Sequence, residues 1–523
     1  MNAVSPKLTP YDVVPYPSDA FPQTDPRRIS CLARMFGLDV ASPRRARVLE
    51  LGCASGGNIL PLAARMPGSE FVGVDFSNVQ IGEARRLMLN QGLGNVVFHQ
   101  MDLADIGADF GSFDYIICHG VYSWVPVATQ AAILRIAHDN LSQNGVAFIS
   151  YNTYPGWKSR EILRDSMQFH TRALPYGAQQ VAHARGMLDF MRKVSAPAST
   201  FSRLLEDQGA LIKDAPDNYL LHEYLESDNR PCYFHQFNAR IEAAGLTYLG
   251  DTDTFMMFAE NFGAETQQAL MNETQGNQIL IEQYLDFCTN RSFRQTLVVK
   301  ASHQASINRQ IKPESMKQFC YRGLITGVTG DMADPASQLM FATRRGNQLR
   351  AADSFTKAAL FSLLEHQPGS VDFKGWLSAI ATKLGGSDPQ RADALAILIT
   401  QMVVGGHIDM FDEPFVSGKA ETGKPKADDF ARRQLAAGVV SIATPFHEPQ
   451  RLNIVETALL PKLDGTRGPG ALIAHLEAEV AAGRLQFHKD GQPITARKDI
   501  AEQARQHFHA NIASLGQKAL LAH

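Results

Sequence analysis

ELGCASGGN, residues 50–58, follows a short apolar run and carries three glycines in nine positions. Glycine lets the backbone turn tightly between a strand and a helix, and it lets the main chain approach a ligand closely. Position 54 is Ala, so the segment does not meet the dinucleotide-binding pattern GxGxxG. We therefore expect the first strand-to-helix turn of a parallel α/β sheet here, with a polar ligand at its edge.

Short β-forming runs alternate with helical patterns on either side of this turn. The predicted strands cover 47–51, 70–75, 95–100, 115–118 and 146–151, and the predicted helices cover 58–66, 77–91 and 126–141. This alternation indicates βαβ units, which form a parallel sheet with helices on both faces. The predicted fold class is α/β with a Rossmann-like sheet, followed by mostly α C-terminal modules. A helical stretch at 159–211 precedes one more strand, at 246–249, that returns to this sheet.

Composition limits the classes of protein. A chain of 523 residues requires several cores, and a formal charge of −3 provides no broad positive field for nucleic acid. The six cysteines show no CxxC pair and no metal-ligand spacing, so we expect a reduced, cytoplasmic protein without a bound metal. No apolar run approaches the length of about 18 residues that a membrane span needs, which argues against membrane insertion.

Two acidic residues follow the second and third predicted strands. Asp75 lies at the interval where an acidic side chain accepts hydrogen bonds from ribose hydroxyls, and Asp102 can accept from the exocyclic amine of adenine. Either acid alone is equally consistent with a helix cap or a solvated loop. Their matching positions at successive strand ends favour an adenosine site. A loop that need not hold pyrophosphate then indicates S-adenosylmethionine.

At these residues the chain resembles the class I S-adenosylmethionine-dependent methyltransferases, whose acidic-x-Gly-x-Gly-x-Gly loop corresponds to Glu50, Gly52, Ala54 and Gly56. Four further segments resemble bacterial methyltransferases that carry a methyltransferase regulatory domain, a family that includes rickettsial protein-lysine methyltransferases acting on outer-membrane proteins. These segments are YDVVPYPSDAFPQTDPRRISCLARMFGL (11–38), SYNTYPGW (150–157), DNYLLHEYLE (217–226) and NRSFRQTLVV (290–299).

The resemblance implies a cofactor site for S-adenosyl-L-methionine, which leaves as S-adenosyl-L-homocysteine. Its expected residues are Tyr16, Glu50, Gly52, Cys53, Ala54, Gly56, Asn58, Asp75, Phe76, Gln80, Asp102, Leu103 and His119. The N-terminal arm is rich in proline, so it cannot form a core of its own and is expected to cover the cofactor as a lid.

Substrate is expected to meet the methyl group beyond the fourth and fifth predicted strands. The candidate catalytic residues there are His119, Tyr122, Trp124, Asn152 and Tyr154. Tyr122 and Trp124 are expected as aromatic walls for a cation, and His119 as an orienting or proton-accepting group. A structural role stays open for each, because Trp side chains often pack in turns and an isolated His is more often structural. No Asn/Asp-Pro-Pro-aromatic motif follows the fourth strand, which disfavours nucleic-acid bases and glutamine amides as substrates.

Three domains are expected. They are a methyltransferase domain at 1–265, with a helical cap or dimerisation insert at 159–230 and the family regulatory region at about 214–300; a middle winged-helix-like domain at 266–418; and a C-terminal winged-helix-like domain at 430–523. The helical pattern at 389–411 is too apolar to read a DNA groove, so we expect these modules to contact protein and no nucleic acid. A homodimer through the insert or the regulatory region is also expected.

The sequence thus predicts a methyltransferase that modifies lysine side chains of protein substrates, which the resemblance extends to outer-membrane or surface proteins before export. Two alternatives stay open. A small-molecule methyltransferase would have a deep closed pocket, whereas a peptide substrate needs an open groove. A catalytically silent scaffold would bind the cofactor without turnover.

Overall fold

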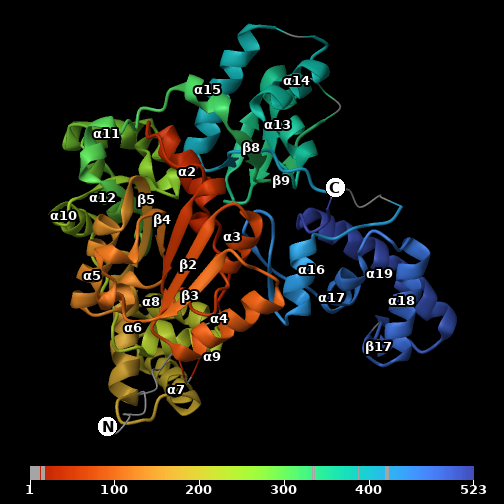
Figure 1. Cartoon of the computed structure of the whole chain (residues 1–523), viewed down its shortest axis with the longest axis horizontal. Helices are drawn as coiled ribbons and strands as arrows, with labels where there is room; N and C mark the ends of the chain where they lie inside the picture. Colours follow the sequence, from red (N-terminus) through yellow and green to blue (C-terminus); the bar gives the residue numbers. More distant parts are fainter. Residues whose placement is uncertain are drawn as a thin grey trace.

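A seven-stranded sheet forms the centre of the molecule (Figure 1). The computed structural model describes residues 12, 14, 18–332, 334, 336–386, 388–418, 423–489 and 491–522. The strands are β1 (Arg47–Leu51), β2 (Glu70–Asp75), β3 (Val96–Gln100), β4 (Phe113–Cys118), β5 (Leu141–Asn152), β6 (Leu246–Asp251) and β7 (Phe293–Lys300), in the order β3-β2-β1-β4-β5-β7-β6. Strands β1 to β5 are parallel, and β7 runs antiparallel to both β5 and β6. The predicted Rossmann-like α/β fold is confirmed.

A layer of helices covers each face of the sheet. Successive residues of β1 point to opposite faces, so this strand contributes side chains to two cores. Val48 packs with α2 (Pro26–Met35), α3 (Ile59–Arg65) and α4 (Asn78–Asn90) in one core. Leu49 packs with α5 (Val127–Asp139) and α10 (Phe234–Ala243) in another. Strand β1 is therefore buried on both faces, as a central strand of a parallel sheet requires.

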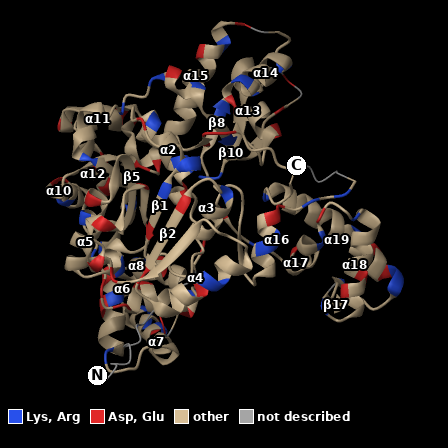
Figure 2. Cartoon of the chain, in the orientation of Figure 1, with Lys and Arg blue, Asp and Glu red and all other residues tan. Residues whose placement is uncertain are grey.

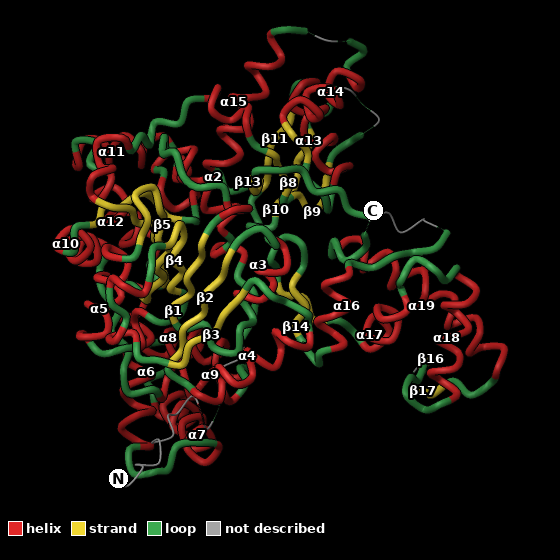
Figure 3. Tube along the Cα trace, viewed as in Figure 1, coloured by secondary structure: helices red, strands yellow, loops and turns green. Residues whose placement is uncertain are grey.

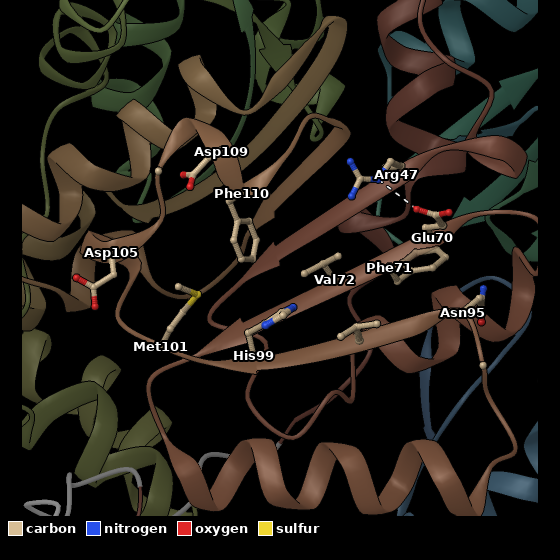
Figure 4. A pocket seen from close by; sticks show the side chains of 13 residues that line it. Arg47, Glu70, Phe71, Val72, Asn95, His99, Met101, Asp105, Asp109 and Phe110 are labelled. Atoms are coloured by element: carbon tan, nitrogen blue, oxygen red, sulfur yellow. Dashed lines mark hydrogen bonds and ion pairs between the residues drawn. The ribbon is translucent and has the colours of Figure 1, made fainter.

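One face of the sheet is left open near β3. Between β3 and β4 the chain makes two single-turn 3₁₀ helices, Leu103–Asp105 and Ala108–Phe110, where α/β folds commonly place an α-helix. Figure 4 shows the resulting groove, with Val72, His99, Met101 and Phe110 on its walls. None of the sequence-predicted cofactor or catalytic side chains lines this groove.

The expected helical insert is a bundle with its own core. It comprises α6 (Gly156–Thr171), α7 (Ala178–Val194), α8 (Thr200–Lys213) and α9 (Asp217–Leu220), followed by a π-helical turn at Leu221–Leu225. Leu163, Leu188, Leu205 and Ile212 are among its buried residues. The chain then returns through α10 to β6, so the predicted return of the chain to the first sheet is correct.

Strand β7 corrects the expected boundary after residue 265. Helices α11 (Ala264–Thr274) and α12 (Gln278–Thr289) precede β7, which lies inside the first sheet between β5 and β6. The sequence analysis assigned no strand there, and the segment NRSFR (290–294) carries one arginine just before the strand and one inside it. Both are buried, and Arg294 pairs with Glu282 at 2.9 Å and with Asp286 at 2.8 Å. The ion pairs compensate for the cost of burying the arginine charge. A buried strand can therefore contain arginine, and the sequence does not show it as an apolar run.

The middle part of the chain packs directly on the part that holds the seven-stranded sheet. It contains β8 (Cys320–Gly323), β9 (Ile325–Thr329), β10 (Leu339–Thr343), β11 (Gln348–Ala351), α13 (Ser354–His366), β12 (Val371–Asp372), α14 (Phe373–Lys383), α15 (Gln390–Val404) and β13 (Ile408–Phe411). Its strands form two small sheets, β11-β10-β9 and β12-β8-β13. Phe319, Tyr321 and Trp376 belong to the same buried cluster as Phe36 of the first part, so the two parts share one apolar core.

The C-terminal part has a separate core and lies beside α3 and α4 (Figure 1, blue). It contains α16 (Asp429–Ala436), β14 (Ser441–Ala443), β15 (Pro449–Arg451), α17 (Ile454–Leu459), α18 (Pro469–Ala481), β16 (His488–Lys489), β17 (Gln492–Pro493) and α19 (Arg497–Gln517). Figure 3 shows that helices dominate this part. The sequence analysis assigned no separate helix to α19.

Charges of both signs are interspersed over the elements (Figure 2). Among the described residues, no helix combines the length and the apolar character that crossing a bilayer requires.

Candidate active site

The glycine loop joins β1 to α3 and curls over the end of β2. The backbone N–H groups of Gly52 and Cys53 both donate to the carbonyl oxygen of Val74, at 2.8 and 3.0 Å. Gly52 has a φ of +73°, and a Cβ on it would lie 2.4 Å from Val121 Cγ2, so only glycine fits this position. Ala54 also adopts a positive φ, +46°. The loop therefore keeps a glycine-type path although Ala replaces the middle glycine.

A buried carboxylate lies beneath this loop. Glu50 is 4% exposed, and its Oε1 accepts a hydrogen bond of 2.7 Å from Asn58 Nδ2. Its Oε2 is buried without a hydrogen-bond partner among the described residues. Burial, and secondarily the negative charge of Asp75, raise the pKa of Glu50 to about 8 although the Asn58 hydrogen bond lowers it. An unpaired buried acceptor of this kind fits a cationic ligand group such as an ammonium.

The N-terminal arm lies across the loop from the outside. Gly57 N–H donates to Ser18 Oγ at 2.7 Å, and a Cβ on Gly57 would lie 1.9 Å from the Ser18 carbonyl oxygen. Phe21 N–H and the Thr24 hydroxyl both donate to Asn58 Oδ1, each at 3.0 Å. Residues 18–24 therefore hold the glycine loop from its outer side. Tyr16, the expected cofactor residue of this arm, lies outside the described residues.

Asp75 and Asp102 lie close together, since Met101 N–H donates to the Asp75 carbonyl oxygen at 3.1 Å. The Asp75 carboxylate accepts from Ala54 N–H through Oδ2 and from Ser77 N–H through Oδ1, each at 2.9 Å. Burial raises the pKa of Asp75 from its ordinary value, and the two backbone hydrogen bonds oppose that rise. Asp102 Oδ1 caps its own turn by accepting from Ala104 N–H at 2.9 Å.

The other side chains expected around an adenine ring differ in exposure. Phe76, beside Asp75, is 55% exposed, so its ring is free for a planar ligand. Gln80 and Leu103 are buried, at 4% and 8% exposed, and Cys53 is 2% exposed. The structure therefore offers Phe76 as a contact surface, whereas the buried three support the loops.

His119 follows β4 at the reaction side of the sheet. Its Nδ1 lies 3.0 Å from the Ser150 hydroxyl oxygen, which also accepts from Gly120 N–H at 2.9 Å. The His119 ring lies 4.1 Å from the Phe21 ring, centroid to centroid. Burial lowers the pKa of His119 to about 4, so the imidazole is neutral at neutral pH. The sequence analysis missed Ser150, although it opens the quoted segment SYNTYPGW.

Tyr122 does not lie on this rim. Its side chain is 0% exposed, and its ring meets Phe237 edge-on at 5.3 Å and Tyr151 at 6.1 Å in the core under the sheet. The structure thus places the Tyr122 ring in the core and not on the accessible rim where the sequence analysis expected it. The cause is the short 3₁₀ turn at Tyr122–Trp124, which directs the first ring of CHGVYSW inward.

The remaining predicted residues gather where β5 ends. Trp124 contacts the buried Trp157 edge-on at 5.9 Å. Asn152 Nδ2 donates to Asn229 Oδ1 at 3.0 Å, which ties β5 to the segment after the insert. The Tyr154 hydroxyl donates to Glu161 Oε1 at 2.5 Å, and Lys158 Nζ lies 3.8 Å from the Tyr154 ring centroid. Trp124 and Tyr154 are half-buried, so each keeps part of its ring accessible.

The glycine loop, the acidic strand ends and this rim together form one continuous edge of the sheet. The edge carries a buried carboxylate oxygen that has no partner within the described part of the chain, a second carboxylate, an accessible ring and a neutral histidine. These groups fit a ligand with an ammonium group, ribose hydroxyls and a flat base, which S-adenosylmethionine combines.

Sequence comparison places three known families along the chain. Residues 48–145 match the family described as "Methyltransferase domain", residues 216–300 match "Predicted methyltransferase regulatory domain", and residues 423–520 match "PKMT, C-terminal winged helix domain". The Rickettsia prowazekii protein RP789 is 32% identical over 98% of this chain and 93% of its own length. RP028 from the same organism is 36% identical over 43% of this chain and 91% of its own length.

Solved structures give the same result over the full length. PKMT2 from Rickettsia typhi superposes with a TM-score of 0.86 at 29% identity, covering 97% of this chain and 100% of that chain. The same enzyme has also been solved in complex with AdoHcy, with the same TM-score, identity and coverage.

Proposed function

Because this chain belongs to the family of S-adenosylmethionine-dependent methyltransferases that combine a methyltransferase domain, a methyltransferase regulatory domain and a PKMT winged-helix domain, we propose that it methylates lysine side chains of protein substrates. The single observation that carries the proposal is the full-length likeness to PKMT2, which extends through the winged-helix part. Small-molecule methyltransferases such as trans-aconitate 2-methyltransferase match only part of this chain.

For the cofactor, we assign the contacts as follows. Glu50 Oε2 accepts from the ammonium of the methionine end, and the Gly52–Asn58 loop lets the main chain lie against the ligand. Asp75 accepts from the ribose hydroxyls, while Phe76 and Asp102 contact the adenine ring and its amine. When bound, the cofactor supplies an electrophilic methyl group on a sulfonium.

For the transfer step, this chain's residues align the acceptor and exclude water. Lysine must lose its proton before it attacks, and its pKa in water is about 10.4. A rim of aromatic rings disfavours the ammonium form because it desolvates the charge. The neutral His119 ring, held by Ser150 and packed at an angle of 56° against the Phe21 ring, adds no positive charge beside the reacting amine.

Of the five candidate catalytic residues, we assign substrate contact to His119, Trp124, Asn152 and Tyr154 on the basis of their positions. We assign Tyr122 to support from below, because its buried ring packs against Phe237 and Tyr151. Removing the rim side chains should then affect turnover, and removing Tyr122 should affect stability.

We also propose a homodimer through the helical insert. Its helices α6 to α8 expose large apolar side chains, namely Phe169 (67%), Phe190 (57%), Val194 (60%) and Leu211 (58%). Apolar side chains of this size gather in interfaces more often than on monomer surfaces. Light scattering of wild-type protein should give twice the chain mass, and Phe190→Asp combined with Val194→Asp should halve it. A monomeric wild-type protein contradicts this proposal.

We further propose that the enzyme works in the cytoplasm on outer-membrane or surface proteins before their export. The six cysteines are all free, as a reducing compartment favours, and the family resemblance supplies the substrate class. The test is mass spectrometry of proteomes from cells with and without this protein. Lysine methylation that disappears with the enzyme from envelope proteins supports the proposal, and unchanged lysine methylation contradicts it.

A further inference from the structure

His447 of the C-terminal part reaches the glycine loop of the methyltransferase domain. Its Nε2 lies 2.7 Å from Asn58 Oδ1, and 389 positions of sequence separate the two residues. His447 is 1% exposed and stands in the turn between β14 and β15 with a φ of +59°. A positive φ is uncommon outside glycine, and histidine is one of the few residue types that adopt it more often.

The surrounding contacts determine which atom donates. Asn58 Oδ1 already accepts from Phe21 N–H at 3.0 Å, so it is the amide oxygen. The His447 contact must then come from an Nε2–H donor. Burial lowers the pKa of His447 to about 3, so the ring is neutral and carries a single N–H.

Asn58 connects His447 to Glu50, the residue assigned to the cofactor. Its Nδ2 donates to Glu50 Oε1 at 2.7 Å, which leaves Glu50 Oε2 as the oxygen without a partner among the described residues. An amide held at both ends cannot rotate freely. The orientation of the Glu50 carboxyl group therefore depends on the donors that converge on Asn58.

Neighbouring contacts fix the turn that carries His447. Arg27 Nη2 donates to the Pro445 carbonyl oxygen at 2.9 Å. Glu448, the next residue, accepts from Arg322 Nη1 and Nη2 at 2.8 and 3.0 Å and from Arg344 at 2.7 Å. The turn is thus held by the first and the middle parts of the chain at once.

We infer that His447 is a positioning residue of the cofactor site: through Asn58, the C-terminal part orients the Glu50 carboxyl group that receives the cofactor's ammonium. The inference rests on the proposed function. It assigns to the C-terminal part, besides any contact with substrate, a share in cofactor binding that acts through Asn58.

The test is calorimetry of S-adenosylhomocysteine binding to full-length variants. His447→Leu removes the donor and should weaken binding roughly tenfold, because a buried amide oxygen loses a hydrogen bond. His447→Gln keeps an N–H donor on a side chain of similar length and should restore the Kd to within about threefold of wild type. Both variants place a branched or long side chain at the same positive φ, so backbone strain is matched between them.

Asp428→Asn is the matched control. Asp428 joins the same two parts of the chain through an ion pair of 2.6 Å with Arg65 on α3, without contacting Asn58. This variant should keep the Kd within about twofold while it lowers the melting temperature. A loss of binding in Asp428→Asn equal to that in His447→Leu would show that general loosening, and not the His447 donor, is responsible.

If His447→Leu does not fold, His447→Asn replaces it, because Asn tolerates a positive φ and is too short to keep the same contact. A wild-type Kd in the donor-free variant, or no rescue by His447→Gln, contradicts the inference alone. Wild-type protein that binds no S-adenosylhomocysteine contradicts the proposed function as well.

Discussion

Asn58 Nδ2 lies 2.7 Å from Glu50 Oε1, and this hydrogen bond places the other carboxylate oxygen of Glu50 in the buried edge of the glycine loop without a partner among the described residues. A carboxylate buried in this way has an energetic cost that a bound cation removes. The relationship links the motif residues of the loop to the chemistry of the ligand.

Replacing Glu50 by Gln should weaken S-adenosylmethionine binding by about 10- to 100-fold, because a neutral amide loses the charge-assisted hydrogen bond to the ammonium. Isothermal calorimetry measures the Kd. A wild-type Kd in Glu50→Gln would show that Glu50 does not contact the cofactor.

The raised pKa of Glu50 also predicts that the stability of the ligand-free protein depends on pH. Its pKa rises in the folded protein from 4.5 to about 8, chiefly because of burial. Stability from this group is therefore fully present below pH 4.5 and is lost as pH rises to about 8. The stability of ligand-free Glu50→Gln relative to the wild type should therefore rise by up to about 5 kcal/mol across this interval. Urea denaturation at pH 5 and at pH 9 measures the free energy of unfolding of both proteins. The same difference between variant and wild type at both pH values would contradict the expectation.

Asp75→Asn should reduce cofactor affinity by at least about tenfold, because the carboxylate holds two loop N–H groups and is assigned to the ribose hydroxyls. Asp105→Asn, an exposed acid beyond the third strand, is the control and should leave the Kd unchanged. The account of the ribose contact is wrong if both variants bind S-adenosylhomocysteine equally well.

Substitutions of Tyr122 should change the stability of the protein and not the rate of methyl transfer. Tyr122→Phe should retain transfer, since its ring is buried in the core, whereas Tyr122→Ala should lose about 3 to 5 kcal/mol of stability through the cavity it creates. Denaturation curves and initial rates distinguish the two effects. Loss of methyl transfer in a stably folded Tyr122→Phe variant would show that the Tyr122 hydroxyl takes part in the reaction.

His119→Phe keeps a ring against Phe21 but removes the contact with Ser150, and kcat should fall by about 10- to 100-fold. Because the pKa of His119 is about 4, its titration should produce no inflection in the rate between pH 6 and pH 9. A wild-type kcat, or an inflection near pH 6.5 that the variant abolishes, would contradict the role of a neutral His119.

Local patterns predicted the parallel half of the fold well. Strands β1 and β2 have the predicted bounds, because each is a short apolar run bounded by turn residues. β7 was missed because Arg294 inside it and Arg291 just before it make the segment look polar, and the acids on other elements that pair with them are not visible locally. His447 was missed for a related reason, since only the folded chain brings it to Asn58.

In the candidate site too, local sequence indicated some features, and others depended on contacts that form only in the folded chain. Motif spacing singled out the loop residues and Asp75 as candidates, whereas the direction of the Tyr122 side chain depended on a single 3₁₀ turn that spacing does not determine. Ser150 gave no signal of its own, since its role arises from the contact with His119 across β4 and β5.

The most direct test is incubation of the purified enzyme with isotopically labelled S-adenosylmethionine and envelope proteins, followed by mass spectrometry of the modified residues. The account predicts labelled methyl groups on lysine side chains, and their absence when Glu50→Gln replaces the wild type at limiting cofactor. Label confined to small molecules or to residues other than lysine would contradict it.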